Sequence, residues 1–131
     1  MSTFLSIASI GIGATFGASC RYYIGIISAQ YLGKGLPYGT LISNIIGSFI
    51  AGVLIVLVLE KLLLSETYRL MLLVGLAGSL TTMSALSLES VEMLSGGHYS
   101  QALINILLNL LLSLMAASLG VVASKYLLSL A

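Results

Sequence analysis

The chain has 131 residues, of which 59% are hydrophobic and only 7% are charged, and its formal net charge is +1. A soluble domain carries about a quarter charged residues to cover its surface, so this composition excludes water as the main solvent. The nearly neutral charge gives no basis for binding nucleic acid.

Four apolar segments are each long enough to cross about 30 Å of hydrocarbon, which takes roughly 20 helical residues. The predicted spans are Phe4 to Ile27, Tyr38 to Leu59, Leu70 to Leu88 and Ala102 to Val122. We therefore expect an all-α membrane protein with four transmembrane helices in a single domain, residues 1–131. It would be a multi-pass protein of the cell (plasma) membrane, with both termini on one side.

The first span lacks the basic region and the small-residue cleavage site of a signal peptide, so we expect it to stay in the membrane. Arg21 is the one charge in this span and lies near its end. Such a side chain can either reach to the interface or attract anions into a vestibule. Gly13 and Gly17 allow close approach of a helix, either from this chain or from a second one.

The second and fourth spans each carry a line of polar side chains at four-residue spacing, which places each line on one helical face. The two lines are Thr40, Asn44 and Ser48, and Asn105, Asn109 and Ser113. An amide in hydrocarbon needs a hydrogen-bonding partner. The lines therefore either bond to each other or border a water-filled path, and three intramembrane Asn residues favour the path.

The middle of each span lacks acidic residues, lysine and histidine. A cation pathway or a proton-coupled exporter normally places a carboxylate there, whereas neutral N–H and O–H donors can replace the water of a small anion. Four such helices do not enclose a path alone, so we expect half of a two-chain anion passage. The lone His98 has no metal cluster or nucleophile-base pair with it, so we do not expect an enzyme.

The third span combines Gly75, Gly78 and Ser79 with the pair Thr81-Thr82, a poor composition for a helix in the middle of a membrane. A break there would free backbone carbonyls, which a bound cation could satisfy. The alternative is an unbroken glycine-rich helix packed closely on a neighbour, and the periodicity alone favours that alternative.

Three segments resemble the CrcB/Fluc family of fluoride channels, in the order and spacing of that family: Gly13 to Tyr22, Gly39 to Phe49, and Gly75 to Glu89. The fourth span fits more loosely, because Asn105 stands where a Tyr is usual. The resemblance implies a broken third helix and an antiparallel, dual-topology dimer, whose two subunits insert in opposite directions. It also implies passive export of fluoride ion through a narrow pore on either side of the dimer interface.

The resemblance implies a set of site residues as well. The pore-lining positions would be Thr40, Asn44, Met83, Ser84, Leu86, Asn109 and Ser113. Arg21 would belong to the vestibule. The main-chain carbonyls of Gly78 and Thr81 would hold a structural Na+ ion.

The third span departs from the family motif Thr-Thr-Phe-Ser-Thr-Phe-Ser at Met83, Ala85 and Leu86. The positive edge of a phenyl ring can face an anion, whereas Leu offers no such edge and Met is a soft apolar filler. We therefore expect a heterodimer with a different family member that keeps both Phe residues. The alternatives are a homodimer that conducts poorly or with altered selectivity, a proton-coupled exporter of small cations, and a purely structural subunit.

Overall fold

The computed structural model describes residues 2–33, 35–60 and 65–130, and every regular element within these ranges is a helix. The first two spans are α1 (Thr3–Tyr31) and α2 (Tyr38–Ile55), which continues into the π-helical turn η1 (Val56–Glu60). The third span consists of α3 (Glu66–Arg69), the π-helical η2 (Leu70–Ala77), α4 (Gly78–Leu80) and α5 (Met83–Ser95). The fourth is α6 (Tyr99–Ser129).

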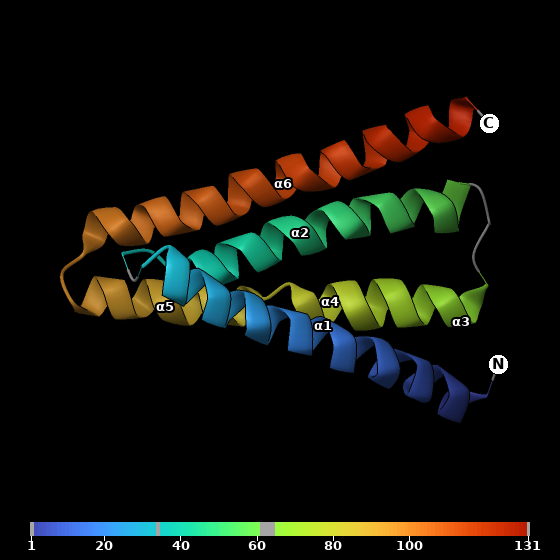
Figure 1. Cartoon of the computed structure of the whole chain (residues 1–131), viewed down its shortest axis with the longest axis horizontal. Helices are drawn as coiled ribbons and strands as arrows, with labels where there is room; N and C mark the ends of the chain where they lie inside the picture. The colour runs from blue at the N-terminus through green and yellow to red at the C-terminus, as the bar shows by residue number, and fades with distance from the viewer. Residues whose placement is uncertain (1, 34, 61–64, 131) are drawn as a thin grey trace.

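Four stretches of the described chain are long and apolar enough to cross a membrane: Thr3–Tyr31, Tyr38–Val58, Glu66–Ser95 and Tyr99–Ser129. This confirms the prediction of a four-span, multi-pass membrane protein. The first, third and fourth spans are longer than predicted, because a helix continues into the interface where Ser, Gln and Tyr side chains can be hydrated. Figure 1 shows both termini at the same end of the bundle, as expected for four spans.

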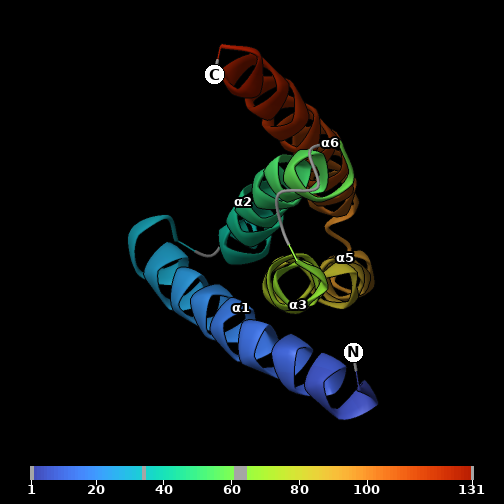
Figure 2. The ribbon, with the colours of Figure 1, turned by 90° about the vertical axis from the view of Figure 1, so that its right-hand side faces the viewer.

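The four spans form an open arrangement. Seen from the end that carries the termini, α1 and α6 lie on the two outer sides, with α2 and the third span between them (Figure 2). The outward faces of α1 and α6 carry large exposed apolar side chains, such as Phe16 and Leu119. Apolar outer faces are what lipid tails solvate well, so the surface agrees with a membrane location.

Glycines on α1 let that helix pack closely on the third span. A Cβ atom built on Gly13 would lie 1.8 Å from the carbonyl oxygen of Met71, and one on Gly17 would lie 2.2 Å from the carbonyl oxygen of Leu76. No side chain fits at such distances. Of the two partners that the sequence left open for these glycines, the structure shows a helix of the same chain.

The contact between α2 and α6 is built in the same way. A Cβ on Gly52 would meet the carbonyl oxygen of Ala117 at 2.2 Å, and one on Gly120 would meet that of Phe49 at 2.4 Å. Both helices therefore run backbone against backbone over this stretch. The close approach brings the polar line of α2 within reach of the polar line of α6.

The third span is broken, as the resemblance implied, although periodicity alone favoured an unbroken helix. Thr81 (φ −78°, ψ 153°) and Thr82 (φ −153°, ψ 118°) are extended between the end of α4 and the start of α5. Thr82 caps α5, because its Oγ1 accepts a hydrogen bond from the Ala85 N–H at 3.2 Å. The glycine-rich stretch before the break also packs closely, since a Cβ on Gly75 would lie 2.5 Å from the carbonyl oxygen of Ile10.

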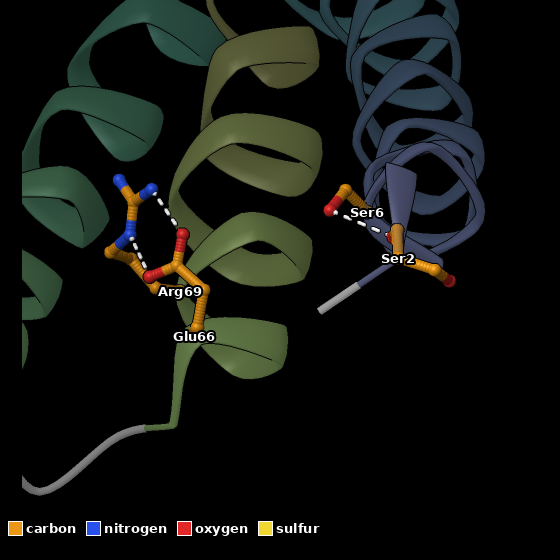
Figure 3. A network of polar contacts seen from close by, with 4 residues as sticks. All are labelled: Ser2, Ser6, Glu66 and Arg69. Carbon is orange, nitrogen blue, oxygen red and sulfur yellow. Dashed lines mark hydrogen bonds and ion pairs between the residues drawn. The ribbon is translucent and has the colours of Figure 1, made fainter. Parts of the chain in front are cut away.

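Polar contacts mark the end of the bundle that carries the termini. The Arg69 guanidinium donates to both carboxylate oxygens of Glu66, at 2.8 and 2.6 Å, in the first turn of the third span. In the first turn of α1, the Ser6 hydroxyl donates to the carbonyl oxygen of Ser2 at 3.4 Å. Figure 3 shows both pairs at this end of the molecule, where the spans meet water.

Candidate functional site

A groove of about 540 Å³ opens beside the break, between α2, the third span and α6. It brings together five of the seven predicted pore-lining residues: Asn44, Met83, Leu86, Asn109 and Ser113. The two predicted sodium ligands, Gly78 and Thr81, border the same groove. Residues from three spans thus meet where the sequence placed a polar path, although their roles in conduction stay predictions.

The break is held by the side chain of Asn44, which lies opposite Thr82. The Asn44 Oδ1 accepts a hydrogen bond from the Thr82 N–H at 2.7 Å, and the Asn44 Nδ2 donates to the Thr82 carbonyl oxygen at 3.3 Å. Both backbone groups of Thr82 are thereby satisfied without a helix. This matters because an unpaired backbone group at membrane depth is costly.

The break separates the carbonyls of Gly78 and Thr81 from their helical donors. In a continuous helix the Thr82 N–H would donate to Gly78 and the Ala85 N–H would donate to Thr81. Here the first donates to Asn44 and the second to the Thr82 hydroxyl. Unwound carbonyls of this kind coordinate Na+ in membrane proteins, so Gly78 and Thr81 fit the predicted ion. Two carbonyls do not complete an oxygen shell, which takes about six ligands, so further oxygens would be needed.

The polar lines of α2 and α6 hydrogen-bond to each other. The Asn44 Nδ2 donates to the Asn109 Oδ1 at 2.8 Å, and the Asn109 Nδ2 donates to both the carbonyl oxygen and the Oδ1 of Asn105, each at 3.0 Å. The three side chains are buried, with exposed fractions of 8%, 2% and 2% in chain order. The sequence favoured a lined path over such bonding, whereas the structure shows the bonding, and Asn44 and Asn109 border the groove as well.

Ser113 carries a hydroxyl donor in this groove that is not used by another described residue. Its Oγ is buried and has no hydrogen-bond partner among the described residues. Because a hydroxyl can donate to an anion, Ser113 is one groove position where a small anion would find an unused O–H. Its place on α6, one turn beyond Asn109, follows from the spacing read in the sequence.

Thr40 and Ser84 lie outside this groove. Thr40 lines a second cavity, of about 560 Å³, at the end of the bundle opposite the termini, together with Glu89, Glu92 and His98. Its hydroxyl donates to Oε1 of Glu89, whose Oε2 is buried without a partner among the described residues. Sequence reasoning assigned Glu89 no role, although its place at the end of the third resembling segment, Gly75 to Glu89, was a signal.

The Ser84 hydroxyl lies 3.0 Å from the Thr82 hydroxyl in the first turn of α5 and is exposed beside the break. Arg21 is partly buried on α1. The sequence placed Arg21 near the end of its span, but α1 continues to Tyr31, which lies roughly 15 Å further along the helix axis. The vestibule role of Arg21 therefore stays a prediction, for a residue that lies deeper than expected.

A four-span chain with a broken third helix and a polar groove open on one side has the construction of a channel or transporter subunit. A family model described as CrcB-like protein, Camphor Resistance (CrcB), matches residues 8–121. The chain belongs to this family. The resemblance noted in its three segments is thereby confirmed.

Relatives named fluoride-specific ion channel FluC match nearly the whole chain. The chain is 44% identical over 118 residues to the one from Sulfurihydrogenibium sp., covering 90% of this chain and 95% of that protein. It is 39% identical over 120 residues to the one from Vibrio vulnificus, with coverage of 92% and 95%. The protein from Magnetococcus marinus is 38% identical over 121 residues, with coverage of 92% and 98%.

Proposed function

We propose that this chain is a subunit of a fluoride channel, through which fluoride leaves down its gradient, and that it has no enzymatic activity. The observation that carries the proposal is the groove beside the break, whose polar lining consists of hydroxyls and amides without a carboxylate. A small anion needs such donors to replace its water and is repelled by acids. The names of the relatives supply the identity of the anion.

A second subunit, inserted in the opposite direction, would complete the passage. The groove is open on one side, and large apolar residues on its rim are exposed, among them Met83, Leu110 and Leu114. A fluoride path bounded on one side by lipid tails would offer the ion no donors there. An antiparallel dimer would close the groove and bring two broken spans together.

The partner would be a different family member that keeps both Phe residues of the motif. Met83 has an exposed fraction of 73% and faces outward at the rim, whereas Leu86 is 6% exposed and packed into the groove wall. Neither side chain offers a ring edge to an anion, so the aromatic edges would come from the partner. A homodimer that conducts weakly is the alternative.

The structural Na+ ion would lie between the two subunits at their breaks. Each chain would contribute the freed carbonyls of Gly78 and Thr81. Hard cations take oxygen ligands in sets of about six, so two chains supply more of the shell than one. Such an ion would join the subunits and satisfy carbonyls that lipid cannot.

Reconstitution tests these assignments together. Liposomes loaded with fluoride would receive this chain alone, a Phe-retaining FluC alone, or both, and a fluoride electrode would record efflux, with chloride release as the selectivity control. We expect slow or no efflux from this chain alone and fast efflux when co-purified pairs are reconstituted. Fast efflux from this chain alone would overturn the heterodimer but not the channel, whereas absence of efflux in every pairing would favour a structural subunit. Proton-driven cation flux would favour the exporter.

A further inference from the structure

We propose that Asn105 and Asn109 are positioning residues, which fix the orientation of the Asn44 amide and thereby hold the third span open at Thr82. The inference concerns the wall of the groove, and its consequence for ion flux rests on the proposed channel function. It is carried by a chain of hydrogen bonds that runs from α5 through α6 and α2 back to the break.

The donors and acceptors in this series of hydrogen bonds can be assigned in only one way. The Ser90 hydroxyl donates its only proton to the Leu86 carbonyl oxygen at 2.7 Å, so toward Asn105 it can only accept. The Asn105 Nδ2 donates to Ser90 Oγ at 3.3 Å. This leaves the Asn105 Oδ1 pointing at Asn109, beside the Asn105 carbonyl oxygen.

Asn109 meets two oxygens of Asn105 and must therefore present its NH2 group to them. A flipped Asn109 amide would bring its own oxygen against both acceptors. With the NH2 group fixed, the Asn109 Oδ1 faces Asn44 and accepts from the Asn44 Nδ2 at 2.8 Å. The Asn44 Oδ1 is then left to accept from the Thr82 N–H. Each orientation is thus determined by the residue before it in the chain of bonds.

All residues in this series of hydrogen bonds are buried, which makes the loss of any one bond costly. Ser90, Asn105, Asn109, Asn44 and Thr82 are all at most 8% exposed. Water cannot readily replace a missing partner at such positions, and an unpaired buried donor or acceptor is costly. A change at Asn109 would therefore reach Thr82 through Asn44, even though Asn109 does not bond to the third span itself.

The same bonds give the Nδ2 atom of Asn44 and the Nδ2 atom of Asn109 two acceptors each. Both amides are therefore engaged within the protein wall. The amides shape the groove by holding the break, and hydroxyls such as that of Ser113 add further donors for an anion.

The amide of Thr82 reports on the proposal directly. The chain would be labelled with 15N-threonine, which gives six backbone amide signals, and Thr82→Ser would assign the signal of interest. We expect Asn109→Ala to shift the Thr82 amide proton upfield and to speed its hydrogen exchange by at least about 10-fold, the size of one lost buried hydrogen bond. Asn44→Ala should do the same.

Two further variants keep the test decisive. Ser118→Ala is the matched control, because Ser118 lies on the exposed face of α6 and its hydroxyl bonds within that helix to Leu114. It should leave the Thr82 signal unchanged. If Asn109→Ala does not fold, Asn105→Ala removes the side-chain acceptor while leaving its carbonyl, and a smaller shift of the same sign is expected. An unchanged Thr82 signal in the folded Asn variants would overturn the proposal.

A double-mutant cycle tests whether Asn109 acts through Asn44. In reconstituted subunit pairs that conduct fluoride, Asn44→Ala and Asn109→Ala in this chain should each lower fluoride efflux by about 10-fold. The double variant should lower the efflux no further. Multiplied losses would show that Asn109 acts independently and would contradict the proposal. If the unaltered protein conducts no fluoride in any pairing, the proposed function fails, while the Thr82 signal still decides the inference.

Discussion

The third and fourth spans carry polar residues at the same depth, yet only the third breaks. In α6 the polar residues are spaced by four and separated by leucines, so the helix continues for 31 residues and the amides project sideways. In the third span two adjacent threonines follow a Gly-Ser pair, and their hydroxyls bond to backbone groups nearby. β-Branched residues with such local bonds compete with the helix. The spacing of polar residues therefore decides whether they form a line along a continuous helix or interrupt the helix.

Replacing Asn44 with Leu removes the two hydrogen bonds to Thr82 that stabilise the break in the third span, whereas α6 has no break. It leaves the N–H and the C=O of Thr82 without their buried partner, so we expect a loss of about 2–5 kcal/mol in the free energy of unfolding, together with the loss of fluoride efflux. Unfolding in mixed micelles measures the first effect. Ser48→Ala, one turn along α2, is the control and should change stability by less than about 0.5 kcal/mol.

Alanine at matched glycines compares how tightly the two spans are packed. Gly120→Ala on α6 would meet the backbone of α2, and Gly75→Ala on the third span would meet the backbone of α1, at similar distances. We expect Gly120→Ala to cost about 3 kcal/mol and Gly75→Ala about 1 kcal/mol, because a broken span can shift and a continuous one cannot. Equal costs would show that the break adds no freedom. Gly11→Ala, with open space around its Cβ, should not destabilise the protein.

Thr82→Val keeps the shape of the side chain and removes the cap of α5. The Ala85 N–H loses its acceptor, so we expect a destabilisation of about 1 kcal/mol, with faster hydrogen exchange in the first turn of α5. Thr81→Val serves as the comparison, because the Thr81 hydroxyl donates to Ala77 and caps no helix. A larger cost for Thr81→Val than for Thr82→Val would contradict the assignment of the cap.

Replacing Na+ by a large organic cation tests whether an ion at the carbonyls of Gly78 and Thr81 stabilises the third span but not α6. At about five times its Kd, a bound ion stabilises the folded state by roughly 1 kcal/mol. We expect a Tm lower by a few degrees without Na+, and faster hydrogen exchange around residues 78–82 but not in α6. Equal changes in both spans would argue against an ion at the break.

Much of the fold followed from the sequence, because long apolar runs without charges have few alternatives to spanning helices. The composition around Gly78 and the two threonines raised the possibility of a break, but only the family resemblance favoured it over an unbroken helix, and neither indicated how Asn44 stabilises it. The hydrogen bonds of Asn44 to Thr82 depend on how closely α2 lies against the third span. That distance is set by the close packing of α2 on α6 and of the third span on α1.

The candidate site was predicted in part for a similar reason. Four-residue spacing placed Asn44 on one polar line and Asn109 and Ser113 on the other, and these three residues border one groove. Thr40, one turn nearer the loop end, bonds instead to Glu89. Which way each amide points is set by its neighbours in space, so the sequence did not reveal that Asn44, Asn105 and Asn109 bond to one another.

In the proposed dimer, a subunit that has not yet paired would expose the groove beside the break to acyl chains. These cannot hydrogen-bond to the Ser113 hydroxyl or to the carbonyls of Gly78 and Thr81. A lone subunit would therefore be less stable than a paired one, and its locally unwound third span would be accessible to membrane proteases. Subunit ratios in the cell would then be set by the turnover of unpaired chains as much as by their synthesis.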